Sequence, residues 1–159
     1  MITVFNKLNY LRSNRITQVK LPISAVAQEL SAALLIAADC NKRQELGELL
    51  LDELCDLAQI TIVSLTVNDS NQQHRRRNGR IIMKRFGLYK VREKIIRIEN
   101  RTAARGQIIS PKSFLDTLLH EWLHHYDFQK LKLNSIHSRG FYNRFNDLKE
   151  KLQIPKMSR

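Results

Sequence analysis

The sequence lacks the features of disulfide-bonded, zinc-ribbon and membrane-spanning proteins. Among 159 residues, Cys40 and Cys55 are the only cysteines, so a four-cysteine zinc ribbon is excluded and we expect two free thiols in a reducing compartment. No stretch approaches the roughly 18 to 20 apolar residues of a membrane helix. Residues 1–10 lack the apolar core of a secretion signal. We therefore expect a cytoplasmic protein with no membrane partner.

Internal repeats, low-complexity tracts and interdomain linkers are also lacking. With 43% hydrophobic and 26% charged residues, a chain of this length can bury the core of one folded domain. We expect a single α+β domain over residues 1–159. Its predicted parts are an N-terminal helical part at about 22–58, a small antiparallel sheet at about 60–99, and catalytic helices at about 111–152.

The helices are predicted from apolar residues that recur on one face. Residues 22–38 have this spacing, from Ile23 and Val26 to Leu34, and so do residues 42–58. Runs rich in β-branched residues predict strands at 60–67, 80–89 and 94–99. Residues 68–79 are polar and turn-like, and residues 1–21 are expected to form a short strand followed by a basic loop.

The net charge of +12 is concentrated in one block. Residues 75–105 carry twelve Lys or Arg against Glu93 and Glu99, whereas residues 21–60 have a net charge of −5. Such a block attracts polyanions, so we predict a contact with DNA, although basic residues also serve simply to solvate a sheet. The candidate nucleic-acid-binding residues are Arg75, Arg76, Arg77, Arg80, Lys84 and Arg85.

The segment His120-Glu121-Trp122-Leu123-His124 indicates a metal site. Two histidines four residues apart on a helix project from the same face, and Glu121 lies beside them. Ser110 is a suitable N-cap and Pro111 suits the first helical position. A pattern with three fixed letters also recurs by chance on surface helices.

The apolar neighbours of these histidines favour the metal site over a chance match. The residues around them include Leu118, Leu119, Trp122 and Leu123. Histidine and glutamate are costly to bury among such side chains without a partner, and a metal ion supplies one. We therefore predict that His120 and His124 bind Zn²⁺ and that Glu121 is catalytic.

A hydrolytic zinc site usually takes three protein ligands. The candidates for the third ligand are Asp127, His137 and, less favourably, His125, which is turned about 100° from His124. Asp127 lies three residues after His124, where it can bind metal or orient a histidine. His137 follows a connector long enough to fold back, and we favour it.

These segments resemble the SprT-like zinc metallopeptidases, a family that includes the bacterial SprT proteins and the DNA–protein-crosslink protease Spartan. The resemblance is carried by Thr117-Leu118-Leu119, by the segment 120–124 and by His137 with Phe141 four residues later. It extends weakly to Gly87-Leu88-Tyr89 and to residues 95–98. The sequence departs from the family pattern in having Ser138 where glycine often follows the third histidine, and it has no C-terminal zinc ribbon.

The resemblance implies a zinc peptidase that acts on a protein or peptide substrate. His120, His124 and His137 would hold the ion, and Glu121 would accept a proton from water. A substrate chain could pair with the strand at 94–99. The oxyanion donor is left open among Tyr89, Tyr126, Tyr142 and Arg139. The competing hypothesis is a nucleic-acid-binding protein whose zinc is structural or vestigial.

Overall fold

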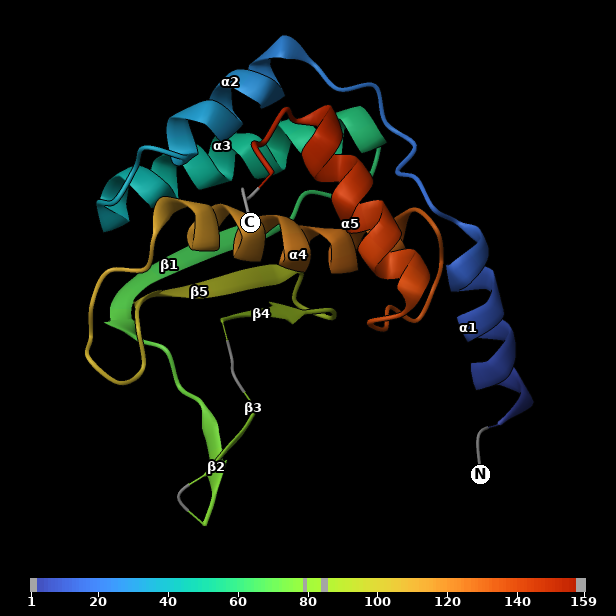
Figure 1. Ribbon diagram of the computed structural model, residues 1–159. Coiled ribbons are helices and arrows are strands. Elements are labelled where there is room, and N and C mark those ends of the chain that lie inside the picture. The colour runs from blue at the N-terminus through green and yellow to red at the C-terminus, as the bar shows by residue number, and fades with distance from the viewer. Residues whose placement is uncertain (1–2, 79, 84–85, 157–159) are drawn as a thin grey trace.

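The computed structural model describes residues 3–78, 80–83 and 86–156, in which five helices and five short strands follow one another (Figure 1). Their bounds are α1 Val4–Arg15, α2 Ala25–Leu34, α3 Cys40–Ala58, β1 Ser64–Asn71, β2 Arg75–Arg77, β3 Arg80–Met83, β4 Gly87–Lys90, β5 Ile95–Arg101, α4 Pro111–Gln129 and α5 Arg139–Lys151. The predicted α+β class is confirmed. The helices predicted at 22–38 and 42–58 correspond to α2 and α3.

The main sheet has three strands in the order β1-β5-β4 and is mixed, so the predicted antiparallel sheet is wrong. β4 and β5 form an antiparallel hairpin, whose turn ends at Lys94 with φ 53°. β1 lies parallel to β5 on the other side. The reason is that β5 folds back from β4 into the centre of the sheet. Strand β1 therefore neighbours β5, which is not the next strand in the chain.

The region predicted as one strand at 80–89 is divided between two sheets. β3 pairs with β2 in a separate antiparallel hairpin, and β4 joins the main sheet. Residues 75–77, predicted as an exposed loop tip, form β2 of this hairpin. In Figure 1 the hairpin extends away from the body of the protein.

Helix α4 lies at the centre of the molecule, between the sheet and the other helices (Figure 1). One side of α4 contributes seven buried side chains to the core, namely Phe114, Leu115, Leu118, Leu119, Trp122, Leu123 and Tyr126. Burying a large apolar side chain contributes about 1.5–3 kcal/mol. The core therefore fixes the rotation of α4, and with it the direction in which its remaining side chains point.

The buried side chain of Arg43 holds the segment that leads into α4. Its guanidinium donates to the carbonyls of Ala37 (2.9 Å) and Ile109 (2.8 Å) and to Asn100 Oδ1 (2.7 Å). Burial lowers the pKa of Arg43. These three bonds join the end of β5 to the helical layer, and α4 begins two residues after Ile109.

The N-terminal segment is a helix, so the predicted strand and basic loop over residues 1–21 are wrong. Thr3 caps α1 by accepting a hydrogen bond from the backbone N–H of Asn6. The usual burial pattern is reversed in this helix. The polar Ser13 is buried, whereas the apolar Val4 and Phe5 are 76% and 72% exposed. Its inner face is polar, which is why hydrophobic periodicity did not reveal it.

Helix α1 packs closely against the start of α5 at Gly140. A Cβ atom at residue 140 would lie 2.0 Å from the backbone oxygen of Ser13. We therefore expect Gly140→Ala to push the two helices apart and to lower the free energy of unfolding by about 2 kcal/mol. Urea denaturation would measure the change, with Asn143→Ala on the exposed side of α5 as control. Equal losses in the two variants would contradict this contact.

Candidate metal centre

Three histidine side chains converge on one point beside α4. His120 and His124 project from the same face of the helix, and His137 comes from the segment just before α5. The Nε2 atom of His137 lies 3.0 Å from the Nε2 atoms of both other histidines. One ligand atom from each of the three lies within 4.8 Å of the others. Their placement agrees with the predicted ligand set.

Phe141 sets the orientation of the three imidazole rings. Its ring stacks on His124 at a centroid distance of 4.6 Å and lies 5.0 and 5.3 Å from the rings of His120 and His137. Ser138 caps α5 by accepting a hydrogen bond from the N–H of Phe141. The cap thus places Phe141 one turn after His137, and the fully buried phenyl ring supports all three histidines from the core side.

The protonation states of His120 and His124 suit metal binding. Burial lowers the pKa of His120 to about 4 and that of His124 to about 3, so both rings are neutral at pH 7. A neutral imidazole offers a lone pair, which is the form that binds zinc. Tetrahedral zinc with Zn–N bonds of about 2.0–2.1 Å separates its nitrogen ligands by about 3.3 Å. The observed 3.0 Å is close to this spacing.

A hydrogen-bonded chain fixes the tautomer of His124. The Asp127 carboxylate can only accept, so the Ser135 hydroxyl donates to Asp127 Oδ2 (2.9 Å). Ser135 Oγ therefore accepts from Nδ1–H of His124 (2.8 Å). Nε2 of His124 is then unprotonated and faces the cluster. Asp127, considered above as a third ligand, instead orients a histidine through a serine.

Arg144 pairs with Asp127 inside the protein. Both side chains are 0% exposed, and the guanidinium makes two bonds to the carboxylate at 2.8 and 3.1 Å. The same guanidinium donates to the backbone oxygens of Ser13 and Ile16, both at 2.7 Å. The C-terminal end of α1 is in this way connected to the residues that orient His124.

His125 points away from the cluster and serves as a structural link. Its Nε2–H donates to the carbonyl of Thr61 (2.6 Å), and its Nδ1 accepts from the hydroxyl of Tyr89 (2.7 Å). The side chain is fully buried. It joins α4 to β4 and to the segment before β1, and it is not one of the clustered ligands.

Glu121 is 9% exposed and lies against β4. Burial raises the pKa of its carboxyl to about 7, although the backbone N–H of Tyr89 donates a hydrogen bond to it. A Cβ atom at Gly87 would lie 2.7 Å from Thr117 Cγ2 and 3.2 Å from Glu121 Cγ. Only glycine permits this close approach of the strand to the helix.

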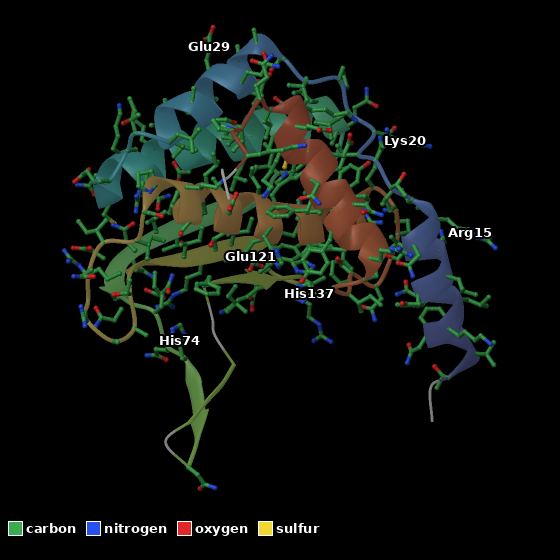
Figure 2. The ribbon with its side chains drawn as sticks, viewed as in Figure 1. Arg15, Lys20, Glu29, His74, Glu121 and His137 are labelled. Carbon is green, nitrogen blue, oxygen red and sulfur yellow. The ribbon has the colours of Figure 1, made fainter. Side chains whose placement is uncertain are left out.

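Glu121 and two of the histidines share one cleft of about 540 Å³. Figure 2 shows Glu121 and His137 on the side of α4 that faces away from α2 and α3. The cleft is lined by Phe86, Gly87, Leu88, Asp116, Thr117, His120, Glu121, His137, Tyr142 and Phe145. A chain of extended polypeptide could reach the clustered imidazoles here.

The structure distinguishes among the four candidate oxyanion donors. Tyr142 lines the cleft and is 46% exposed. The hydroxyl of Tyr89 bonds to His125, and that of Tyr126 accepts from the backbone N–H of Lys20 at 2.8 Å. Arg139 is exposed and does not line the cleft. Tyr142 is the one of the four that can meet a ligand in this cleft.

The strand predicted to pair with a substrate, residues 94–99, is wrongly placed for that role. It forms most of β5, whose two edges are occupied by β1 and β4. In the part of the chain that the structure describes, the outer edge of β4 has no strand partner. The available edge beside the cleft is therefore β4.

Four of the six predicted nucleic-acid residues belong to the β2–β3 hairpin. The backbone of Arg75, Arg76, Arg77 and Arg80 belongs to its two strands. Lys84 and Arg85 lie outside the described residues. In Figure 1 the hairpin projects away from the main sheet and lies apart from α4 and α5.

Sequence reasoning missed Ser135 and Arg144, which orient the cluster. Ser135 gave no signal, because its role depends on a loop conformation. Arg144 did give one, since it lies on the apolar side of α5 near Phe141 and Leu148. An arginine on such a face requires a buried carboxylate partner.

No family model matches this chain, and neither does any curated protein or solved structure. Among the described residues, no helix combines the length and apolar character needed to cross a membrane. The geometry of the site is therefore the basis for assigning a function.

We expect Ser135→Ala to lower the affinity for Zn²⁺ by about tenfold, because partners that orient a metal-binding histidine typically contribute 10- to 100-fold. Competition with a fluorescent chelator would measure the dissociation constant. Ser113→Ala, an exposed serine on α4, is the matched control. Unchanged affinity in Ser135→Ala would show that the bond to His124 does not support binding.

Proposed function

We propose that this protein is a zinc-dependent metallopeptidase of the SprT-like type, which hydrolyses peptide bonds of a protein substrate. The observation that carries this proposal is the meeting of three imidazoles at one point, two of which share a cleft with the buried Glu121 carboxyl. A structural zinc site needs no such carboxyl, and an isolated buried glutamate is costly. The expense of burying Glu121 is consistent with a catalytic role.

His120, His124 and His137 would hold the ion. Zn²⁺ bound there lowers the pKa of water and polarises a peptide carbonyl. The neutral state of His120 and His124 and the fixed tautomer of His124 fit this role.

Glu121 would act as general base. A base works best when its pKa lies near the working pH, and burial brings the pKa of Glu121 to about 7. The N–H of Tyr89 and the close approach of Gly87 hold the carboxyl in place. Glu121 takes a proton from water and delivers it to the leaving amine.

Tyr142 would stabilise the negative charge that develops on the carbonyl oxygen. It follows His137 by five residues, and the two rings are 6.0 Å apart. Its hydroxyl is a hydrogen-bond donor on the wall of the cleft. The other two candidate tyrosines, Tyr89 and Tyr126, do not line the cleft.

The substrate would bind as an extended strand along the outer edge of β4. Exposed N–H and C=O groups of an edge strand pair with a peptide without regard to its sequence. Gly87 at the start of β4 lies beside Glu121, so a chain paired with this strand passes the general base. This edge replaces the one predicted at residues 94–99.

The metal content of purified protein tests the ligand set. We expect about one Zn²⁺ per chain in the wild type by elemental analysis and a substantial loss in His137→Ala, because two histidines alone bind weakly. Zinc retained in full by His137→Ala would contradict a three-histidine site. Absence of zinc from carefully prepared wild type would contradict the peptidase proposal itself.

The general base is tested by Glu121→Gln, which preserves the shape of the side chain. We expect cleavage of an unfolded protein such as casein to fall at least a hundredfold, while zinc content stays at the wild-type level. Gel analysis over time and elemental analysis on the same preparations would measure both. Wild-type cleavage by the variant would remove Glu121 from the mechanism.

Nucleic-acid binding is a second candidate function, and the net charge of +10 over residues 75–105 favours it. The β2–β3 hairpin extends from the body, so it can contact phosphates without blocking the cleft (Figure 1). Under this hypothesis the zinc is structural or vestigial. The two functions also combine in a peptidase that acts on proteins associated with DNA.

Replacement of Arg75, Arg76 and Arg77 by alanine should weaken DNA binding and make it less sensitive to salt. Each lost phosphate contact lowers the slope of log K against log salt by about 0.9. Fluorescence anisotropy with duplex and single-stranded DNA at several salt concentrations would measure it, with Arg15→Ala in α1 as control. An unchanged slope would place the DNA contact elsewhere or exclude it.

A further inference from the structure

A second groove, of about 600 Å³, lies between α1 and the segment that leads to His137. Its lining residues are Val4, Asn6, Lys7, Asn9, Tyr10, Asn134 and Ile136. The three apolar side chains among them remain partly exposed, at 76% for Val4, 47% for Tyr10 and 37% for Ile136. The groove is outside the cleft that contains Glu121, and none of the steps above uses it.

Two hydrogen bonds join α1, on one side of this groove, to the segment that leads to His137 on the other side. Asn9 Nδ2 donates to the backbone oxygen of Asn134 (2.8 Å), and the N–H of Asn134 donates to Asn9 Oδ1 (2.9 Å). The Asn9 amide thus bonds to both backbone polar groups of Asn134, as a neighbouring strand would, and holds the segment before His137 against α1. Ile136 directly precedes His137, so their Cα atoms are about 3.8 Å apart.

The groove and the cleft lie along the same side of the molecule. In Figure 1, β4, the segment before α5 and α1 follow one another along the side opposite α2 and α3. The cleft reaches His137 from the side of β4, and the groove reaches Ile136 from the side of α1. A polypeptide extended along β4 and past the histidines is therefore directed toward the groove.

The chemistry of the groove selects an apolar side chain. Lys7 is the one charged residue among its lining residues. The other lining residues are three apolar side chains and three uncharged asparagines, so the groove offers apolar surface and no negative charge. Another copy of the protein is a poor occupant, because a net charge of +12 makes two copies repel each other.

We propose that this groove is a substrate subsite, which takes an apolar side chain of the polypeptide being cut. The inference rests on the proposed peptidase function and specifies its substrate as a chain long enough to reach α1. His137 lines the cleft and its neighbour Ile136 lines the groove, so the two sites are close along an extended chain that advances about 3.3 Å per residue. We therefore place the bound side chain roughly two to four positions from the scissile bond. Recognition of this kind favours unfolded or extended segments over short peptides.

The cut-site profile of the wild-type protein tests this inference. Casein fragments identified by mass spectrometry should show Leu, Ile, Phe or Val enriched at one fixed position two to four residues from the cut. The double variant Val4→Ser with Tyr10→Ser should lose this enrichment and show a kcat/KM about tenfold lower for a twelve-residue peptide. A blocked dipeptide, which has one residue on each side of the scissile bond, is too short to reach the groove and should be cut equally by both proteins.

The matched control is Phe5→Ser with Leu8→Ser, which removes exposed apolar residues of α1 that do not line the groove. This control should keep the wild-type profile. An equal effect in both double variants, or no enrichment at a fixed position, would overturn the subsite. Self-association of the wild type that is abolished by Val4→Ser with Tyr10→Ser, measured by sedimentation, would assign the groove to a second copy instead.

Failure of the subsite and failure of the peptidase function are distinguishable through binding. A fluorescent twelve-residue peptide with a central leucine should bind zinc-loaded Glu121→Gln about tenfold more tightly than Glu121→Gln that also carries Val4→Ser and Tyr10→Ser. Cleavage without this difference overturns the subsite alone. Binding with this difference, but no cleavage by the wild type, overturns the peptidase function and leaves a peptide-binding groove.

Discussion

The arrangement of the candidate metal centre depends on the buried ion pair between Arg144 and Asp127. Two opposite charges removed from water are tolerated only when each is fully hydrogen-bonded, and both are. The carboxylate reaches His124 through Ser135, and the guanidinium reaches the end of α1. One interaction thus connects α1, α4, α5 and the segment carrying His137. Loss of either charge would leave the other buried without a partner.

Helix α4 performs two tasks with opposite requirements. The side that carries Trp122 and Tyr126 is fully buried and determines how the helix is rotated. The side that carries His120 and Glu121 faces a cleft, where it is supported by β4 and Phe141. Because the apolar side is rigid, the polar side requires little reorganisation to bind a ligand. The positions of apolar and polar residues along α4 therefore specify both the core and the site.

Prediction from sequence succeeded where a single local pattern decides the outcome. Hydrophobic spacing located α2 and α3, and the four-residue spacing of His120 and His124 placed them together. The prediction of an antiparallel sheet was wrong, because strand order depends on pairing between distant segments. Helix α1 was missed because its inner face is polar, with Asn9 and Ser13 directed toward partners more than 120 residues away. The role of Ser135 likewise depends on a tertiary contact.

The sequence separation of the contacts made by α1 has a consequence for biosynthesis. Asn9 and Ser13 bond to residues 125 positions later in the chain. While the chain is being synthesised, α1 has none of these partners until residues 134–144 have left the ribosome. The loop that carries His137 can be fixed against α1 only after that point. The histidine cluster is thus completed only after the segment that follows α4 has been synthesised and has packed against α1.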